Sequence, residues 1–276
     1  MKRLFNLMLL LVALAVSQSA MAWGAWGHHI SAYIAEQHLT PEAKAKCEHY
    51  LQHSLPHYSS WMDHWRNSEP FKETTYWHMN RVDKNFNTIG NQDISRDAVT
   101  QLERVTKEMC KGGYKNLSDS LVAVNLKYII HMVGDMHCPS HIFYTEFEDC
   151  FSGVVNGKKV RRHDQMKVYY NGKKTTSHRV WDGLSIREIW PEYGSDYDKF
   201  RVALDKVKAK KREKMCKGTI EQWALQNAKD IRYIYDVMTP NCKVDRQFLL
   251  DNQKLSKQQC LRASYRLAHI LNECFK

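Results

Sequence analysis

Residues 131–141, with the sequence HMVGDMHCPSH, concentrate side chains of the kinds that bind metal ions. His131 and Asp135 are four residues apart, so on a helix they lie on one face, about one turn apart. Pro139 cannot continue that helix, and we therefore expect His141 to lie just beyond its end. Zinc accepts imidazole nitrogen and carboxylate oxygen, so the segment is suited to zinc. Taken alone, it is equally compatible with a core histidine beside a capping acid.

A second pair with the same spacing favours a metal site over a core histidine beside a capping acid. In the segment SHRVWD, His178 and Asp182 again stand at positions i and i+4. Two such pairs, together with His141 six residues after the first aspartate, call for one common explanation. The sequence therefore predicts a multinuclear metal site whose ligands come from two separate segments.

Helices are expected to position these ligands. The segment before His131, SDSLVAVNLKYII, is apolar at helical spacing, and Ser118 is a suitable N-cap for it. Thr40 followed by Pro41 marks the start of another helix. Further periodic segments predict helices over residues 28–38, 41–53, 60–66, 93–110, 195–213, 218–238 and 256–273, with a loop over 54–60.

The remaining segments are less helical. Residues 76–80 should form a turn or a short extended piece around His78, and the helix 60–66 should carry Asp63 and Arg66 one turn apart. Residues 142–177 are the least helical stretch, and KVYY-NG-KKTT has the alternation and the Asn-Gly turn of a β-hairpin. The sequence thus predicts a mainly α-helical single domain with one small β-hairpin.

Length and composition are those of a globular protein with an export signal. The chain has 276 residues, of which 43% are hydrophobic and 26% charged. Lys2 and Arg3 precede an apolar run that ends in Ala20-Met21-Ala22, which predicts a signal peptide over residues 1–22. The run is too short for a membrane span, and no later segment is long and apolar enough to form one. We expect a secreted or periplasmic protein that begins at Trp23 after cleavage between Ala22 and Trp23.

Charge and cysteine content narrow the possible partners. The net charge of +11 suits an anionic partner such as nucleic acid or a membrane surface, although a solvated basic face is equally common. Export permits disulfides among the eight cysteines, but the sequence does not determine their pairing. No CxxC pair is present, so a zinc site built from cysteines is not expected.

Six segments together carry a family resemblance. They are WGAWGH (23–28), SWMDHWR (60–66), WH (77–78), HMVGDMHCPSH (131–141), SHRVWD (177–182) and RLAHILNECF (266–275). In this order and with these flanks, the chain resembles the S1/P1 nuclease family, which consists of secreted zinc-dependent nucleases related to the zinc phospholipases C. The resemblance implies a mainly α-helical, single-domain phospholipase C/P1 nuclease-like fold over residues 23–276, with a small β-hairpin.

The resemblance also implies three zinc ions in one cleft. The first ion would be held by Asp63, His78, His131 and Asp135. The second ion would be held by His141, His178 and Asp182. The third ion would be held by His28, Asp135 and the α-amino and carbonyl groups of Trp23. Because the amine of Trp23 is free only after cleavage, the third site would depend on removal of the signal peptide.

The implied activity is metal-assisted hydrolysis of phosphodiesters, in which zinc lowers the pKa of the attacking water. Asp63, Arg66 and Asp135 are the implied catalytic residues: Arg66 would stabilise charge on the phosphate, and Asp63 would orient the water. A surface salt bridge is the alternative role for Arg66. The implied substrates are single-stranded DNA and RNA and 3′-nucleotides, with 5′-phosphorylated products. We expect a monomer, although the sequence does not determine the oligomeric state.

Three parts of the sequence depart from the family pattern. Met79, Asn80 and Arg81 follow His78 where the family has an aromatic residue and then an acid or amide, so we expect these three to contact the substrate in a different way. Residues 162–164 are Arg-His-Asp where the family has Gly-Gly-Asn. Cys138 stands where glutamine is usual and could be a disulfide partner, an additional metal ligand or a small buried residue.

Two other functions remain open from the sequence. A zinc phospholipase C would share the metal ligands, but in that branch the last carboxylate is usually glutamate and the first histidine lies further from the N-terminal tryptophan. Asp182 and the spacing of five residues between Trp23 and His28 favour the nuclease branch. The other alternative is a secreted nucleic-acid-binding protein that keeps zinc but has lost catalysis.

Overall fold

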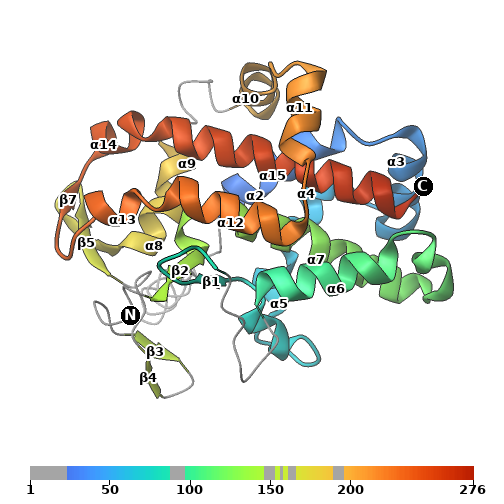
Figure 1. Ribbon diagram of the computed structural model, residues 1–276, viewed down its shortest axis with the longest axis horizontal. Coiled ribbons are helices and arrows are strands. Elements are labelled where there is room, and N and C mark those ends of the chain that lie inside the picture. Colours follow the sequence, from blue (N-terminus) through green and yellow to red (C-terminus); the bar gives the residue numbers. More distant parts are fainter. Residues whose placement is uncertain (1–23, 88–96, 146–152, 156–157, 161–165, 189–195) are drawn as a thin grey trace, which may run out of the picture.

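The computed structural model describes residues 24–87, 97–145, 153–155, 158–160, 166–188 and 196–276. The predicted mainly α-helical fold is confirmed (Figure 1). Three helices form its centre: α2 (Gly24–Glu36), α7 (Asp119–His137) and α15 (Gln253–Cys274) pack on one another. Within the described residues, no helix has the length and apolarity needed to cross a membrane.

Helix α7 is the predicted metal-binding helix, and it forms as expected. The side chain of Ser118 accepts a hydrogen bond from the backbone N–H of Leu121 and caps the helix, and Cys138 ends it just before Pro139. All ten residues from Tyr128 to His137 are buried, so this half of the helix is enclosed by the core. It therefore holds the side chains it carries in fixed directions.

The N-terminal region agrees with the sequence prediction in part. Helix α3 (Pro41–Leu51) begins at Thr40, whose side chain accepts from the backbone N–H of Ala43, as predicted. The predicted first helix, 28–38, instead begins at Gly24 and ends at Glu36. The predicted loop 54–60 contains the single-turn helix α4 (Leu55–Tyr58), because Oε1 of Glu36 accepts from the N–H of Leu55 at 2.9 Å and caps it.

The segment around His78 connects two ligand-bearing regions. Helix α5 (Trp61–Trp65) forms where predicted, and the 3₁₀ helix η1 (Lys72–Tyr76) follows it. Strand β1 (Asn80–Val82) then pairs in parallel with β2 (Ile142–Tyr144), with Asn80 opposite Ile142. The sequence did not predict this pairing, which joins the chain just after His78 to the chain just after His141.

The predicted β-hairpin is confirmed but has an additional strand. Strands β5 (Lys167–Tyr170) and β6 (Lys173–Thr176) pair antiparallel around Asn171 and Gly172, both with positive φ. Strand β7 (Lys243–Val244) adds to β5 in parallel, which the local sequence did not indicate. A further antiparallel pair consists of β3 (Gly153–Val155) and β4 (Lys158–Val160).

The C-terminal helices are more divided than predicted. The expected helix 195–213 ends at Leu204 and resumes at Ala209, because the Asp205 carboxylate accepts hydrogen bonds from His38 at 2.8 Å and Tyr265 at 2.6 Å. The expected helix 218–238 is interrupted between Ile231 and Ile234. The helices of this half are α10 (Tyr197–Leu204), α11 (Ala209–Cys216), α12 (Ile220–Ile231), α13 (Ile234–Val237), α14 (Arg246–Asp251) and α15. Helix α6 (Ala98–Met109) begins after the cap Asp97, and the predicted residues 93–96 lie outside the described part.

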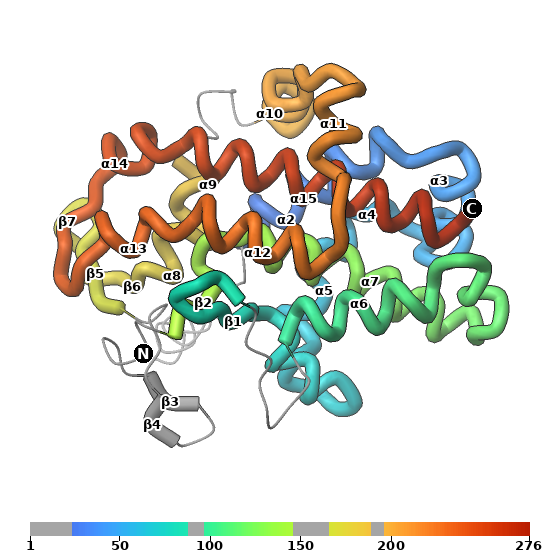
Figure 2. The backbone as a smooth tube through the Cα atoms, in the orientation of Figure 1, coloured from blue at the N-terminus to red at the C-terminus, as the bar shows by residue number. Residues whose placement is uncertain are grey.

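Segments that are far apart in the sequence meet around the buried half of α7 (Figure 2). Helices α2 and α5 contact α7 directly, as does the short 3₁₀ helix η3 (Pro139–His141). Helix η3 in turn contacts α8 (Ser177–Arg179) and the π-helical turn η6 (Val180–Leu184), which continues into α9 (Ser185–Arg187). A 3₁₀ turn η2 (Gly113–Asn116) links α6 to α7. The fold therefore brings the predicted ligand segments to one place.

Candidate metal centre

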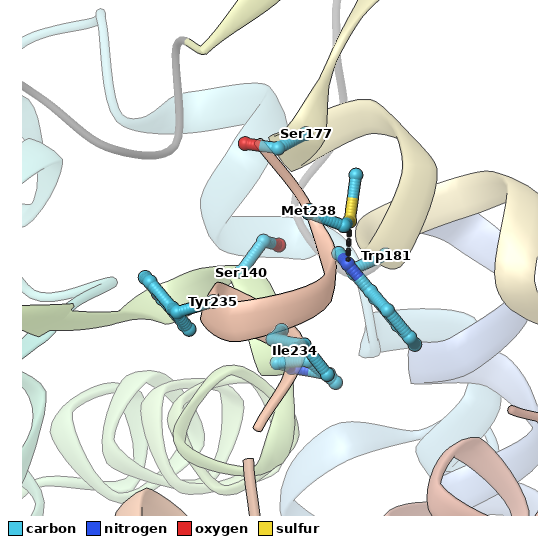
Figure 3. A pocket seen from close by; sticks show the side chains of 7 residues that line it. Ser140, Ser177, Trp181, Ile234, Tyr235 and Met238 are labelled. Atoms are coloured by element: carbon cyan, nitrogen blue, oxygen red, sulfur yellow. Dashed lines mark hydrogen bonds between the residues drawn. The ribbon is translucent and has the colours of Figure 1, made fainter. Parts of the chain in front are cut away.

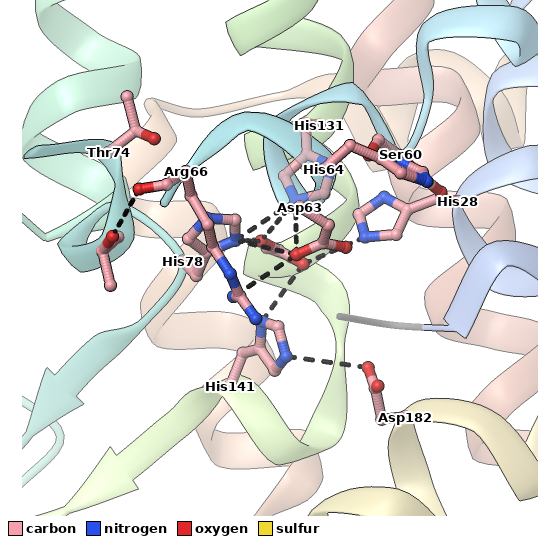
Figure 4. Close-up of polar contacts among 12 residues, drawn as sticks. His28, Ser60, Asp63, His64, Arg66, Thr74, His78, His131, His141 and Asp182 are labelled. Atoms are coloured by element: carbon pink, nitrogen blue, oxygen red, sulfur yellow. Dashed lines mark hydrogen bonds and ion pairs between the residues drawn. The ribbon is translucent and has the colours of Figure 1, made fainter. Parts of the chain in front are cut away.

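Asp135 lies at the centre of four imidazole rings from four segments. Its Oδ1 is 3.1 Å from Nε2 of His28 and 3.1 Å from Nδ1 of His141. Its Oδ2 is 2.6 Å from Nδ1 of His78 and 3.1 Å from Nε2 of His131. All five side chains are buried, and Figure 4 shows how the four rings gather. The fold therefore brings predicted ligands from four segments into direct contact: α2, α7, the segment after η1, and η3.

Asp63 of α5 completes one side of this group. Its Oδ1 is 3.8 Å from Nδ1 of His78 and 3.8 Å from Nε2 of His131. Nη1 of Arg66, one helical turn later, is 3.4 Å from the same oxygen. The side chain of Asp63 is 2% exposed and that of Arg66 27% exposed, so the guanidinium lies on the side that reaches solvent. We call His28, Asp63, His78, His131 and Asp135 the Asp135 cluster.

Two local features set the directions of these rings. Nδ1 of His131 donates to the backbone carbonyl of Ser59 at 2.7 Å, which leaves Nε2 facing Asp135. On α7, a Cβ atom at Gly134 would lie only 2.5 Å from Nδ1 of His28. Glycine at position 134 therefore permits His28 to approach α7 closely.

A second group surrounds Asp182. Oδ1 of Asp182 is 3.6 Å from Nε2 of His141, and Oδ2 is 3.6 Å from Nε2 of His178. The two imidazole rings stack with their centroids 5.1 Å apart. We call His141, His178 and Asp182 the Asp182 cluster. Because His141 also contacts Asp135 through Nδ1, this ring joins the two clusters.

The turn that carries His178 and Asp182 is tightly held. Thr176 caps α8, and the hydroxyl of Ser185, the residue after the π-helical turn, donates to the carbonyl of Trp181 at 2.7 Å. Behind this turn, Nε1 of Trp181 donates to the sulfur of Met238 at 2.6 Å (Figure 3). The cavity there has a volume of about 10 Å³, which is room for about one water molecule. This cavity therefore has no room for a substrate.

Gly24 places the start of α2 against the same turn. Its φ is +44°, and a Cβ atom there would lie 3.1 Å from the carbonyl oxygen of Asp182 and 3.1 Å from Cα of Gly183. The backbone of Gly24 also hydrogen-bonds the Asp182 carboxyl. Trp23, the predicted ligand before it, lies outside the described residues, and its role stays a prediction.

Cys138 lies beside the Asp182 cluster. Its Sγ is 3.1 Å from Oγ of Ser140 and 3.5 Å from Oδ1 of Asp182. Burial is the main cause that raises the pKa of this thiol well above its usual range. The thiol therefore keeps its proton and donates it toward Asp182. The sequence had left three roles open for Cys138: a disulfide partner, an additional metal ligand or a small buried residue.

Electrostatics set the protonation of the Asp135 cluster. Burial alone would raise the pKa of Asp135, but the surrounding imidazoles, led by His131, hold it well below its usual range. Burial alone would lower the pKa of His131, but Asp135 and Asp63 raise it to about 9. Burial prevails at His28 and His78, whose pKa values are lowered. The cluster thus combines an ionised Asp135 with neutral His28 and His78 and a protonated His131, which must lose its proton before it can bind zinc.

The donor atoms also have a spacing that suits metal ions. Ligands at about 2.0–2.2 Å from a tetrahedral zinc ion lie about 3–4 Å from one another, and the contacts above span 2.6–3.8 Å. Three groups have ligand atoms that all lie within 4.8 Å of one another: His28, Asp63 and His131; His78, His131 and Asp135; and Cys138, His141 and Asp182. The residues present therefore fit a cluster of metal ions.

The predicted substrate contacts differ in accessibility. Met79 and Arg81 are partly exposed, whereas the side chain of Asn80 is buried at the start of β1. The first two are therefore accessible from solvent, and Asn80 is enclosed by the core. Residues 162–164, the other departure from the family pattern, lie outside the described part.

One supporting residue was missed at the level of sequence. Arg266 of α15 is buried, and its Nη1 donates to Nε2 of His137 at 2.9 Å, while Nε donates to the carbonyl of Met215 at 3.0 Å. Nδ1 of His137 donates in turn to the carbonyl of Val133 at 2.7 Å. His137 therefore faces away from the metal-type ligands and fastens the end of α7 to α15. The only signal for this was the match of segment 266–275 to the family's closing helix.

Comparison with known proteins agrees with the geometry. A model of the family described as S1/P1 Nuclease matches residues 23–276. Similar curated proteins include Nuclease S1 of Aspergillus oryzae, which is 24% identical over 61% of this chain, and Nuclease P1 of Penicillium citrinum, which is 26% identical over 58%. Endonuclease 3 of Arabidopsis thaliana is 24% identical over 67% of this chain. The aligned parts cover 56%, 57% and 61% of the lengths of these relatives.

Proposed function

Since this chain belongs to the S1/P1 nuclease family, we propose that it is an exported zinc-dependent phosphodiesterase. It hydrolyses single-stranded DNA and RNA to 5′-phosphorylated products and acts on 3′-nucleotides as a 3′-nucleotidase. The observation that carries this proposal is the meeting of eight His and Asp side chains, spread from His28 to Asp182, in two joined clusters. Nuclease S1 and Nuclease P1 bear the activity in their names, which supports the same reaction here.

We assign three zinc ions to these residues. Asp63, His78, His131 and Asp135 would hold one ion, and His141, His178 and Asp182 a second. His28 and Asp135, with the amine and carbonyl of Trp23, would hold the third. When bound, zinc neutralises phosphate charge and brings the pKa of water near neutrality. Helix α2 begins at Gly24, the residue after Trp23, and places His28 at 3.1 Å from Asp135, which supports the assignment of Trp23 to this third ion.

The chain's own side chains supply the rest of the reaction. Arg66 lies on the solvent side of the Asp135 cluster, where its guanidinium can donate two hydrogen bonds to phosphate oxygens. The carboxylate of Asp63 can accept a proton of the attacking water and orient its lone pair toward phosphorus. The oxygen of water would then bond to phosphorus while the bond from phosphorus to the 3′ oxygen breaks, and the departing 3′ oxygen would take up a proton from solvent to become a hydroxyl. The phosphate therefore stays on the 5′ carbon of the next nucleotide.

The positive charge and the export signal complete the proposal. Removal of Lys2 and Arg3 with the signal peptide leaves a net charge of +9, which favours a polyanionic substrate. A single strand can bend toward buried ligands more readily than a duplex. Residues 1–22 act as a signal peptide whose removal frees Trp23. The third zinc site then forms only in protein that has been exported and cleaved.

The test uses protein that begins at Trp23, carries no N-terminal tag and is supplied with zinc. It is incubated with single-stranded DNA, RNA, a 3′-mononucleotide and phosphatidylcholine, each with and without a chelator. Release of 5′-nucleotides and of nucleoside from the 3′-mononucleotide, both blocked by the chelator, is the expected result. Release of phosphocholine alone would instead place the protein among the phospholipases. Bound zinc with no hydrolysis of any substrate would identify a binding protein that has lost catalysis.

A pair of arginine variants tests the proposed role of Arg66. We expect Arg66→Ala to lower kcat/KM for single-stranded DNA about 10²–10³-fold, because it removes a donor to the charged transition state. Zinc content should not change, since Arg66 is not a ligand. The matched control is Arg201→Ala, which removes a guanidinium that pairs with Asp198 on α10 and should retain full activity. Equal activity of the two variants would mean that Arg66 forms only a surface salt bridge and does not contact the phosphate.

A further inference from the structure

Two cysteines that are far apart in the sequence meet at one end of the fold. Sγ of Cys110 is 2.7 Å from Sγ of Cys274, although 164 residues separate them. Cys110 caps the end of α6, and Cys274 is the last residue of α15. Both helices run toward the same end of the molecule in Figure 1. Sulfur atoms this close lie well inside ordinary contact distance, and a disulfide needs only a small further approach.

We propose that Cys110 and Cys274 form a disulfide that fastens the C-terminal helix to α6. The proposal rests on the proposed export, because disulfides persist in oxidising compartments. It goes beyond the nuclease activity, since neither cysteine lies among the proposed zinc ligands. It also selects one pair among the eight cysteines, whose pairing the sequence left open.

The surroundings hold both residues in place for this bond. Cys274 is fully buried, and the next residue, Phe275, packs against the rings of Tyr50 and Tyr114 at centroid distances of 6.3 and 5.0 Å. On the other side, the N–H of Cys110 donates to the carbonyl of Thr106 at 2.9 Å. Because both backbones are fixed by other contacts, bond formation requires little rearrangement.

The two sulfurs differ in solvent accessibility, and this difference determines which cysteine reacts first with an external oxidant. Cys110 is partly exposed, and its hydrogen bond with Cys274 lowers the pKa of its thiol, so Cys110 is the one that attacks an external oxidant. With glutathione disulfide as oxidant, the Cys110 thiolate displaces one glutathione thiolate and forms a mixed disulfide. The pKa of the Cys274 thiol is raised by its contact with Cys110 and by burial, so Cys274 loses its proton as its sulfur attacks that of Cys110 and displaces the second glutathione. Two thiol protons pass to the two glutathiones, and the protein loses two electrons.

The bond would stabilise the helix that supports the metal centre. Helix α15 packs on α2 and α7, and its Arg266 holds the end of α7 through His137. A disulfide that closes a loop of this length removes much conformational freedom from the unfolded chain. The protein is thus fully stabilised only after export, in the compartment where the signal peptide is also removed.

Peptide mapping tests the bond without reference to activity. Zinc-loaded protein isolated from an oxidising compartment is alkylated without reduction, digested and analysed by mass spectrometry. The expected result is a linked peptide pair containing Cys110 and Cys274. Recovery of both as alkylated free thiols, or of Cys274 linked to the neighbouring buried Cys47, would overturn the proposal. Because no substrate is involved, the outcome is independent of whether the nuclease proposal is right.

Thermal unfolding provides the second measurement. We expect a reductant to lower the Tm of the wild-type protein by about 5–10 °C more than that of the double variant Cys110→Ser/Cys274→Ser. The matched control is Cys216→Ser, which keeps a donor to the carbonyl of Tyr265 and should respond to reductant like the wild type. An equal response of wild type and double variant would contradict a stabilising disulfide, even if the double variant is itself less stable.

Discussion

Asp135 and Asp182 are both fully buried aspartates beside imidazole rings, yet their pKa values move in opposite directions. The pKa of Asp135 is held well below its usual range, and that of Asp182 is raised well above it. Burial raises both. Asp135 contacts four imidazoles at 2.6–3.1 Å, which outweigh burial, whereas Asp182 has two imidazoles at 3.6 Å.

The difference shows that burial and partner number together decide the charge of a buried carboxyl. The charges of Asp135 and Asp63 also raise the pKa of Asp182, so the ionised first cluster favours a neutral second one. Without metal, the Asp135 cluster is an ionised network, and the Asp182 cluster holds a protonated acid. Zinc must therefore displace protons from histidine at the first cluster and from aspartic acid at the second.

The largest expected effect comes from replacing the two aspartates by their neutral analogues. Asp135→Asn should abolish activity and zinc binding to the Asp135 cluster, and it should lower the Tm of the metal-free protein by about 5–10 °C, because a buried imidazolium loses its counter-charge. Asp182→Asn should remove zinc from the second cluster only. At mildly acidic pH it should leave the metal-free Tm nearly unchanged, since Asp182 is already neutral there.

Zinc analysis and thermal unfolding with a chelator check both variants side by side. An equal decrease in the Tm of metal-free Asp135→Asn and Asp182→Asn would contradict the proposed difference in charge between the two aspartates. It would mean that Asp182 is ionised in the folded protein in spite of its burial.

A pair of glycine variants tests how closely the Asp135 cluster is packed. Gly134→Ala should cost about 1–3 kcal/mol of stability and displace His28, since the new Cβ would lie 2.5 Å from its ring. Gly183→Ala is the matched control beside Asp182, where a Cβ meets nothing within 4 Å. We expect that control to be neutral or slightly stabilising. Denaturant unfolding measures both, and an unchanged stability of Gly134→Ala would show that His28 can move aside.

The protonation difference predicts how zinc affinity depends on pH. The pKa of His131 is about 9 in the folded protein and ordinarily 6.5, so its proton stabilises the metal-free fold fully below pH 6.5. This contribution is lost as the pH rises through 9. Because zinc requires the neutral ring, affinity at the Asp135 cluster should rise about tenfold per pH unit between these limits and then level off.

Competition with a chromophoric chelator measures that affinity across the pH range. The Tm of the metal-free protein should fall over the same interval in which zinc affinity rises. An affinity that does not change between pH 6.5 and 9 would show that His131 is neutral throughout.

Regular local signals were enough to predict the elements that carry the ligands. Ser118 and the apolar period fixed the start of α7, Pro139 its end, and Asn171-Gly172 the hairpin. Elements that depend on distant partners could not be predicted. Helix α4 needs the side chain of Glu36, and the interruption after α10 needs hydrogen bonds to Asp205 from residues far away in the chain.

The residues of the candidate site also divide into those that local patterns predict and those whose role depends on distant partners. Residue types and i, i+4 spacing were enough to select His131, Asp135, His178 and Asp182, because a ligand pair on one helical turn is a local pattern. The need for Gly134 depends on His28, which is more than a hundred positions earlier. Cys138 was open between three roles because its meaning depends on its distance to Asp182, which no local pattern contains.

The smallest expected effect comes from replacing Cys138. Its measurement distinguishes a thiol that donates a hydrogen bond to Asp182 from a thiolate that binds the metal. As a protonated thiol that donates to Asp182, it orients the carboxyl without binding the metal. Cys138→Ala should then weaken zinc binding at the Asp182 cluster by about tenfold and leave the Asp135 cluster unchanged. Cys138→Ser, which keeps a donor, should lie close to the wild type. Complete loss of the second ion in both variants, with loss of a sulfur-to-metal charge-transfer band after cobalt substitution, would instead make Cys138 a ligand.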